Sequence, residues 1–355
     1  MIFRQAARAL TSTSSALMEF TNAPRPSATI IIAAHLSDAL RPAGGHDGFD
    51  YKVLMIQRSS RGAFKNSYVY PGGVVDKADE DPKWLEMFPQ TELPSGSIAR
   101  RICGIREAFE ECGLLLAEPD GEKSVKIDEK DIARWREEVH NDASRFLHMM
   151  KQYHLRPLVE RLFLFSHWIT PTFETKRFDT PFFLITLPAL PSGPTNGQDP
   201  TALVASSFAT ATTIATPDHK ENVQLNWFTP AQALREFEQG NINYFPPQFY
   251  TLQELSCVPR LEDLSRKFGA REVSPILPEY QFNEDNVGKK EANDEDGPFL
   301  ALPGDAEHTW TLEVPGSMVS KRRHRIYVAP EKPPFKKYRL VMSGIESGSN
   351  AWSKL

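Results

Sequence analysis

The chain has 355 residues, of which 40% are hydrophobic and 25% are charged. This composition is typical of a globular protein with one large domain or two ordinary ones. The net charge of -5 argues against non-specific binding to nucleic acid, and no apolar run approaches the roughly 18 residues of a membrane span. The three cysteines form no CxxC pair, which argues against a disulfide scaffold or a structural zinc site.

The N-terminal segment has a biased composition. It contains Arg4, Arg8 and several Ser and Thr residues, and no acidic residue precedes Glu19. Mitochondrial presequences have this composition, and a frayed N-terminus that lacks acidic residues by coincidence is the alternative. We therefore expect residues 1–27 to be flexible and to include a candidate targeting segment.

Two apolar runs near the start of the chain predict buried strands. Residues 28–35 and 51–57 are short and rich in Ile, Val, Leu or Ala, and a loop rich in Gly, Pro and Asp separates them. Further along, Gly72 and Gly73 follow an aromatic-Pro dipeptide, which indicates a strand end followed by a turn.

The next pattern is helical. The apolar residues Ile98, Ile102, Ile105 and Phe109 recur at helical spacing, and Gly113 stands where a glycine commonly ends a helix. The sequence therefore predicts one amphipathic helix that ends just before Gly113.

The rest of the chain alternates between helix and strand patterns. The expected elements are a helix or helix pair over 128–153, strands over 161–168, 180–187, 224–228 and 338–342, and a helix over 231–238 that opens with Pro230. Residues 188–218 are rich in Ala, Thr, Ser and Pro and are expected to form a mobile excursion. The charged stretch 283–297 is expected to be a solvated loop.

Three glutamates gather near the end of the predicted helix. Glu107 and Glu111 lie at i and i+4, and so on one helix face, with Glu110 on its flank. Like charges this close destabilise a helix, and the helix dipole disfavours anions in its C-terminal half. Mg²⁺ would neutralise them, because it prefers carboxylate oxygens, water and substrate phosphates. Arg106 is placed to pair with one glutamate; a solvated helix face with ordinary glutamates is the alternative.

Gly73 and the sequence REAFEECGL over residues 106–114 together resemble the Nudix box of the Nudix hydrolase superfamily, G-x5-E-x7-R-E-U-x-E-E-x-G-U, where U is a bulky apolar residue. The second half matches at every defined position, with the small residue Ala108 at the first U. In the first half, Asp79 stands where the family has glutamate. The box also carries about 19 extra residues, and this insertion, over 81–97, is expected to form a polar loop before the helix begins.

The last three residues, Ser353, Lys354 and Leu355, form the tripeptide that the peroxisomal import receptor reads. An interrupted box with this terminus resembles the nucleoside diphosphate-linked moiety X motif 19 subfamily, peroxisomal or mitochondrial acyl-coenzyme A diphosphatases. The implied fold is α/β, a Nudix α/β/α sandwich with a mixed sheet. The resemblance predicts a Nudix hydrolase domain over 28–290 and a C-terminal extension over 291–355.

The resemblance also implies a mechanism. Glu107 and Glu111 would be the principal ligands of Mg²⁺ or Mn²⁺, with Glu110 as a further or water-mediated ligand. Arg106 would orient the cluster, and Gly73, preceded by Gly72, would let the loop approach the helix closely. The substrate would be coenzyme A or acyl-coenzyme A, cleaved to 3',5'-ADP and 4'-phosphopantetheine or its acylated form.

The 3'-phosphate of coenzyme A needs a basic partner. Arg58, Arg61 and Lys65 lie between the second predicted strand and the glycine pair, and are candidates for this contact. A solvated loop is the alternative for these three residues.

Two other functions remain open from the sequence. The first is a Nudix enzyme that cleaves NADH or an ADP-sugar, because the box defines the bond cleaved but not the leaving groups. The second is a catalytically weak Nudix fold that binds a nucleotide or acyl-coenzyme A. Asp79 and the insertion favour the binding function, whereas the intact glutamates oppose it.

Overall fold

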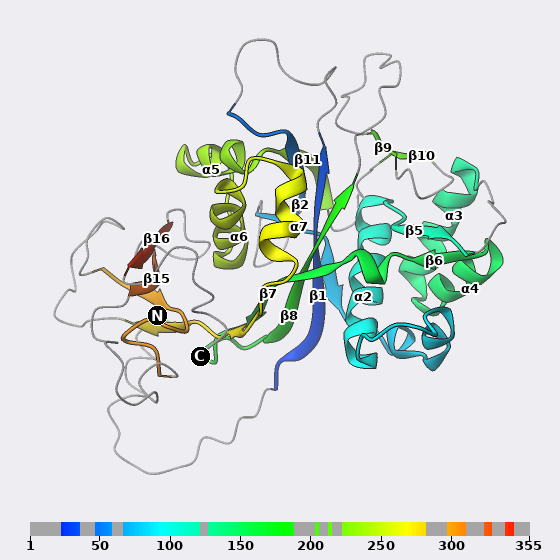
Figure 1. The fold of residues 1–355 in the computed structure, drawn as a ribbon, viewed down its shortest axis with the longest axis horizontal. Coiled ribbons are helices and arrows are strands. Elements are labelled where there is room, and N and C mark those ends of the chain that lie inside the picture. The colour runs from blue at the N-terminus through cyan, green and yellow to red at the C-terminus, as the bar shows by residue number, and fades with distance from the viewer. Residues whose placement is uncertain are drawn as a thin grey trace.

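A mixed β-sheet between two layers of helices forms the centre of the computed structural model (Figure 1). The structure describes residues 23–35, 47–58, 67–120, 127–187, 203–205, 212–214, 222–281, 297–309, 323–328 and 338–343. Within these ranges the arrangement is the expected α/β/α sandwich. No helix in this part of the chain is long and apolar enough to cross a membrane.

The central sheet has the strand order β11-β2-β1-β8-β7-β12, with β3 paired to β2 and β4 paired to β1. Its strands are β1 (Arg25–His35), β2 (Tyr51–Arg58), β3 (Tyr68–Val69), β4 (Gly72–Val74), β7 (Phe163–Ile169), β8 (Phe178–Leu187), β11 (Asn222–Phe228) and β12 (Pro275–Ile276). Strand β1 runs antiparallel to β2 and β4 but parallel to β8, so the sheet is mixed.

The buried strand expected over 28–35 is confirmed as β1, which is buried on both faces. Its side chains alternate between two hydrophobic clusters: Ile30 and Ile32 belong to one, and Ile31 and Ala33 to the other. A helical layer therefore covers each side of this strand.

The first layer packs on the Ile30 side. It contains α2 (Ser95–Cys112), α3 (Glu129–Asn141) and α4 (Ser144–Gln152), with the short elements β5 (Ala117–Pro119), β6 (Leu155–Pro157) and η4 (Val159–Arg161). The helix or helix pair expected over 128–153 is present as two helices, α3 and α4. The predicted helix end at Gly113 is also confirmed, because this residue adopts a φ of 70°.

The second layer packs on the Ile31 side. It contains α5 (Pro230–Glu238), α6 (Pro246–Ser256) and α7 (Leu261–Phe268). The Thr229 hydroxyl accepts a hydrogen bond of 3.1 Å from the Gln232 N–H and so caps α5, and Pro230 occupies the first helical turn as expected.

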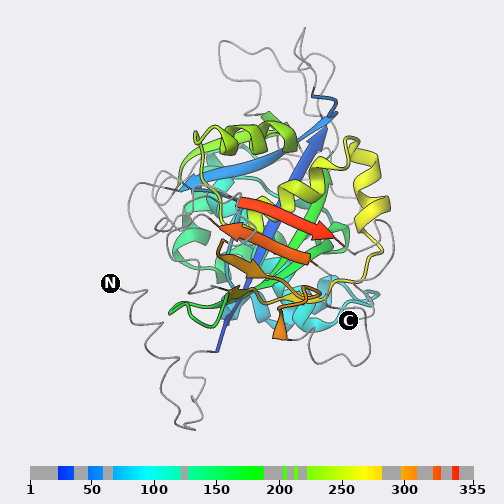
Figure 2. The same cartoon turned by 90° about the vertical axis from the view of Figure 1, so that its left-hand side faces the viewer.

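A second, antiparallel sheet lies beyond α6 (Figure 2). It consists of β13 (Glu279–Gln281), β14 (Phe299–Ala301), β15 (Arg323–Val328) and β16 (Tyr338–Ser343). The Tyr338 ring stacks on Phe237 of α5 at 5.3 Å and lies 5.4 Å from the Phe249 ring of α6. The boundary predicted at residue 290 separates β13 from β14, although these two strands pair and share the second core.

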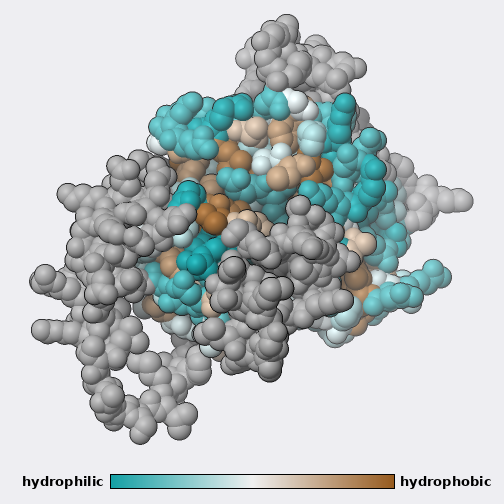
Figure 3. All heavy atoms as spheres, turned by 60° about the vertical axis from the view of Figure 1, so that its left-hand side comes forward, coloured by the Kyte–Doolittle hydropathy of each residue, from teal (hydrophilic) through white to brown (hydrophobic). Residues whose placement is uncertain are grey.

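Both hydrophobic and hydrophilic residues lie on the surface seen when the left-hand side of Figure 1 is turned forward. Figure 3 shows apolar residues gathered within a hydrophilic border. Among the described side chains, Phe173 is 57% exposed and Met342 of β16 is 44% exposed.

The insertion in the box differs from the expected polar loop. It contains the 3₁₀ helix η3 (Pro82–Met87), which follows the 3₁₀ helix η2 (Lys77–Glu80). The side chains of Trp84 and Phe88 are buried in the first core. The Trp84 indole N–H donates to the Ala78 carbonyl at 2.8 Å. The insertion is therefore part of the packed structure beside α2, because two large aromatic rings anchor it.

Two further predicted loops lie largely outside the described residues. In the segment 188–218, the structure describes β9 (Leu203–Ala205) and β10 (Thr212–Ile214), which pair with each other. The charged stretch 283–297 lies outside the described residues except at its end.

Candidate active site

The glutamates lie on α2, which packs against β1 and β4. Its apolar residues Ile98, Ile102, Ile105 and Phe109 are buried. Gly104 permits close packing, since a Cβ there would lie 2.7 Å from Cγ1 of Ile30. The helical spacing recognised in the sequence therefore fixes which face of α2 meets the sheet.

Glu107 and Glu111 both reach β4. The Gly72 N–H donates to Oε2 of Glu111 at 3.0 Å. A Cβ at Gly73 would lie 2.3 Å from Oε1 of Glu107, and a Cβ at Gly72 would lie 2.3 Å from the Ala28 carbonyl oxygen. The two glycines therefore leave space for the carboxylate on one side and for β1 on the other.

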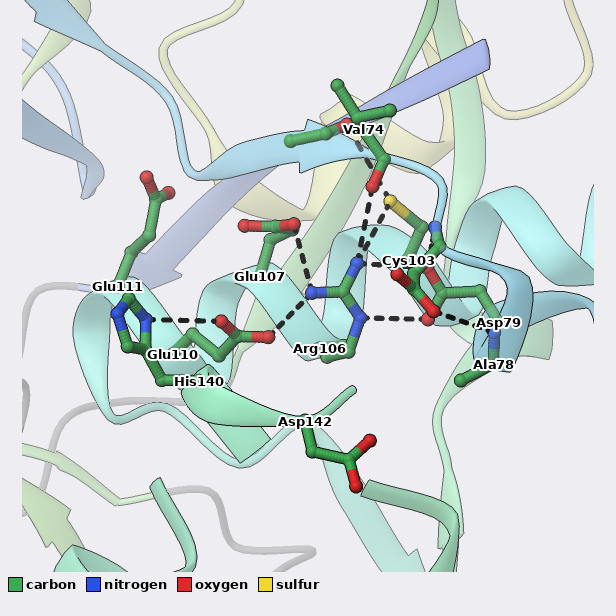
Figure 4. A network of polar contacts seen from close by, with 12 residues as sticks. Val74, Ala78, Asp79, Cys103, Arg106, Glu107, Glu110, Glu111, His140 and Asp142 are labelled. Carbon is green, nitrogen blue, oxygen red and sulfur yellow. Dashed lines mark hydrogen bonds and ion pairs between the residues drawn. The ribbon is translucent and has the colours of Figure 1, made fainter. Parts of the chain in front are cut away.

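Arg106 forms the centre of the acidic cluster (Figure 4). Its Nε and Nη2 donate to the two carboxylate oxygens of Asp79 at 2.8 and 2.9 Å. Its Nη1 lies 2.5 Å from Oε1 of Glu110 and 3.0 Å from Oε1 of Glu107. Burial alone would lower the pKa of Arg106, but these acidic partners raise it above its ordinary value, so the guanidinium is charged.

Asp79, which stands where the family has glutamate, belongs to the same cluster. Its side chain accepts from the Asp76 N–H at 2.9 Å, while Asp76 accepts from the first turn of η2, which forms a capping box. The Asp79 side chain is 1% exposed and engages Arg106 with both oxygens. The shorter carboxylate thus still reaches Arg106, because the cap brings η2 close to α2.

The three glutamates are not equivalent. In Figure 4, Glu107 and Glu111 rise from α2 towards the strand that carries Val74, whereas Glu110 lies between Arg106 and His140. The His140 Nδ1 is 3.4 Å from Oε2 of Glu110. The sequence predicted the shared face of Glu107 and Glu111, but it carried no signal for His140, which comes from α3.

Burial changes the protonation of the cluster. It raises the pKa of the Glu107 carboxyl to about 7, with Glu110 adding to the rise and Arg106 opposing it. Burial also raises the pKa of Glu110 against the opposing effect of Arg106. A cation beside Glu107 would stabilise a negative charge that its surroundings otherwise disfavour.

The donor set suits a hard divalent cation. Among the described residues, no three acidic, His or Cys side chains already converge as a metal site, because Glu110 turns towards Arg106 and His140. Mg²⁺ needs only one or two protein carboxylates and completes its shell with water and substrate phosphates. The pair formed by Glu107 and Glu111, beside Gly72 and Gly73, fits that requirement.

Several residues at the site were not predicted from the sequence. Arg136 of α3 donates to the carbonyls of Glu110 and Glu111. The Cys103 thiol lies 3.6 Å from the Gly73 carbonyl, and burial raises its pKa. Arg136 lies in a charged amphipathic helix, where an arginine gives no sign that it contacts another element.

The predicted basic residues are only partly described. Arg58 lies at the end of β2, where its N–H donates to the Ser67 carbonyl at 3.0 Å. Arg61, Lys65 and the terminal residues 353–355 lie outside the described residues.

A family model described as the NUDT19 Nudix domain matches residues 24–97 and 90–214, which together make up more than half of the chain. The chain belongs to this Nudix family. It is therefore a Nudix hydrolase, as the box residues around α2 predicted.

Other Nudix proteins support this assignment. The chain is 27% identical to the acyl-coenzyme A diphosphatase NUDT19 of Xenopus laevis over 79% of this chain and 80% of that protein. It is 28% identical to the human protein of the same name, over 68% of this chain and 71% of that protein. The crystal structure of a Nudix hydrolase from Alicyclobacillus acidocaldarius shares the fold, with a TM-score of 0.50 and 19% identity over 69% of this chain and 97% of that chain.

Proposed function

We propose that this Nudix hydrolase cleaves the pyrophosphate bond of coenzyme A and acyl-coenzyme A, releasing 3',5'-ADP and 4'-phosphopantetheine or its acylated form. The observation that carries the proposal is the placement of Glu107 and Glu111 side by side against Gly72 and Gly73. The name shared by the Xenopus and human relatives supports the substrate class.

The residues of the acidic cluster are proposed to bind the metal or to orient its ligands. Glu107 and Glu111 would hold Mg²⁺ or Mn²⁺, and Glu110 would be a further or water-mediated ligand. When bound, the cation would neutralise the pyrophosphate charge and activate the attacking water. Arg106 holds Glu107 and Glu110 in place through its ion pairs, and the Gly72 N–H orients the Glu111 carboxylate.

The basic residues after β2 are proposed to contact the 3'-phosphate of the substrate. Arg58 is half-buried at the end of that strand, and Arg61 and Lys65 follow it in the sequence. A guanidinium can bind phosphate oxygens with two parallel hydrogen bonds.

Gly73→Ala tests the close approach of β4 to Glu107. The new Cβ would lie 2.3 Å from Oε1 of Glu107, so the carboxylate must shift. We expect kcat to fall by about 100-fold, as for an ångström-scale misplacement of a catalytic group. The free energy of unfolding should change by less than about 1 kcal/mol, since a flexible side chain absorbs the clash. Initial rates and urea unfolding measure the two quantities.

Gly96→Ala is the matched control. Gly96 lies on α2, the helix that carries Glu107, but a Cβ there would meet no atom within 4 Å, so Gly96→Ala should keep the wild-type kcat. A Gly73→Ala enzyme with wild-type kcat would show that the glycine does not position Glu107.

The substrate assignment is tested by incubating the protein with Mg²⁺ and acetyl-coenzyme A, free coenzyme A, NADH or ADP-ribose in separate reactions. We expect 3',5'-ADP from both coenzyme A reactions and its loss in Glu111→Gln, which lacks one proposed ligand. Cleavage of NADH or ADP-ribose alone would contradict the coenzyme A assignment. Intact substrates with both Mg²⁺ and Mn²⁺ would favour a binding function.

We also propose that the import receptor carries the protein into the peroxisome through Ser353, Lys354 and Leu355. The N-terminal segment with Arg4 and Arg8 supports a second, mitochondrial destination. Microscopy of the tagged full chain, with and without Leu355, tests the first destination; unchanged peroxisomal import without this residue would contradict it.

A further inference from the structure

The C-terminal end of α2 needs hydrogen-bond donors from outside the helix. The Gly113 N–H donates to the Phe109 carbonyl at 2.9 Å, and the Leu114 N–H reaches back to the Ala108 carbonyl. The chain then leaves the helix, so the following N–H groups no longer point along its axis. The next two carbonyls belong to Glu110 and Glu111, which carry carboxylates of the proposed metal site.

One arginine of α3 donates hydrogen bonds to both of these carbonyls. The Arg136 Nε donates to the Glu110 carbonyl at 2.7 Å, and its Nη2 donates to the Glu111 carbonyl at 2.8 Å. The planar guanidinium therefore bridges two consecutive residues, which a single point charge cannot do with the same geometry. Its positive charge also lies at the end of α2 where the helix dipole favours a cation.

The position of Arg136 is set by packing rather than by a flexible surface contact. The adjacent Trp135 is 2% exposed in the first core. Its indole N–H donates to the Tyr153 hydroxyl at 3.3 Å, and the two rings meet edge to face. Val139 on the same helix is also buried. Helix α3 is thus fixed within the first layer by its buried residues.

A second contact from α3 acts on a side chain of the cluster. His140 lies one helical turn after Arg136, and its Nδ1 is 3.4 Å from Oε2 of Glu110. Together with Arg106, it holds Glu110 on the flank of α2, between Arg106 and His140 (Figure 4). Two residues of one helix therefore contact the backbone and the side chain at the same end of α2.

We propose that Arg136 is a positioning residue for the divalent cation. By holding the Glu110 and Glu111 carbonyls, it keeps the last turn of α2 in the register that places Glu111 beside Glu107 at β4. This inference rests on the proposed metal role of those two glutamates. Groups that orient metal ligands typically contribute 10- to 100-fold to metal affinity or activity.

The test compares Arg136→Met with Arg134→Met. Arg134 lies on the same helix but is 49% exposed and pairs with Asp131 and Glu138 of α3 itself. Mn²⁺ binding is measured on each full chain by electron paramagnetic resonance without substrate, and the Mg²⁺ dependence of hydrolysis is measured separately. Circular dichroism and thermal melting show that each variant is folded.

We expect Arg136→Met to weaken Mn²⁺ binding by about 10-fold or more, and to raise the Mg²⁺ concentration for half-maximal activity by a similar factor. Arg134→Met should change either value less than two-fold, on the order expected for a surface ion pair. Arg136→Lys keeps the positive charge but lacks the planar guanidinium that donates to both carbonyls. Its Mn²⁺ affinity should therefore lie between those of the wild type and Arg136→Met. If Arg136→Met does not fold, Arg136→Lys is compared with the wild type instead, and wild-type Mn²⁺ affinity in it would contradict the inference.

Wild-type Mn²⁺ affinity in Arg136→Met, or an equal loss in Arg134→Met, would overturn the inference. The outcome is separable from the proposed function. If the wild type binds Mn²⁺ but cleaves no coenzyme A, the substrate assignment fails, while weaker binding in Arg136→Met still supports the positioning role.

Discussion

Arg106→Met is expected to lower the free energy of unfolding by about 3–5 kcal/mol, the cost typical of removing one partner from a buried ion pair. The Arg106 and Asp79 side chains are 5% and 1% exposed, and Glu110 is 10% exposed. Without the guanidinium, these carboxylates would lose their shared partner while remaining shielded from water. Urea unfolding of the variant and the wild type measures the difference.

Arg100→Met provides a comparison on the same helix. Its ion pair with Asp179 is more exposed, at 23% and 24% for the two side chains, and His167 also contacts Asp179. We therefore expect a smaller loss than for Arg106→Met. A loss below about 1 kcal/mol in Arg106→Met, within the range of surface pairs, would contradict a central role for Arg106 in holding η2 against α2.

Hydrolysis at limiting Mg²⁺ is expected to fall by up to about ten-fold for each pH unit below 7, because protons compete with the cation for the carboxylate of Glu107, a proposed ligand. Burial raises the pKa of Glu107 to about 7, and Glu110 adds to this rise. Initial rates at a fixed, low Mg²⁺ concentration on both sides of this pH measure the effect.

Saturating Mg²⁺ is the control for that experiment, since a high cation concentration displaces the proton and should restore the rate. A rate that stays low at saturating Mg²⁺ would assign the pH dependence to another group.

The raised pKa of Glu107 also affects the free energy of unfolding. Since the folded-state pKa lies above the ordinary 4.5, the metal-free protein should lose stability as the pH rises from about 4.5 to about 7.

Much of the fold followed from local patterns in the sequence. The apolar run over 28–35 predicted a buried strand, and helical periodicity with Gly113 predicted α2 and its end. These predictions succeeded because backbone geometry and burial impose short, regular repeats on the chain. The insertion over 81–97 was interpreted incorrectly as a loop, because two aromatic residues among polar ones produce no periodicity, although Trp84 and Phe88 enter the core.

The C-terminal sheet shows a related limit of sequence analysis. The strand expected over 338–342 is present as β16, but its partners and its packing on α5 and α6 were not predicted. Short strands contribute few residues to any pattern, and their stability depends on partners distant in the sequence. The contact between Tyr338 and Phe237 joins residues that no local signal connects.

By itself, the sequence determined that Glu107 and Glu111 share a helix face, because a helix places residues i and i+4 together. Only the tertiary structure decided which residues surround these two carboxylates. It brought Asp79 to Arg106, Gly73 to Glu107, and Arg136 to the end of α2. The physical reason is that helical spacing is set by bonds within one segment, whereas these contacts form only when separate elements pack against a common core.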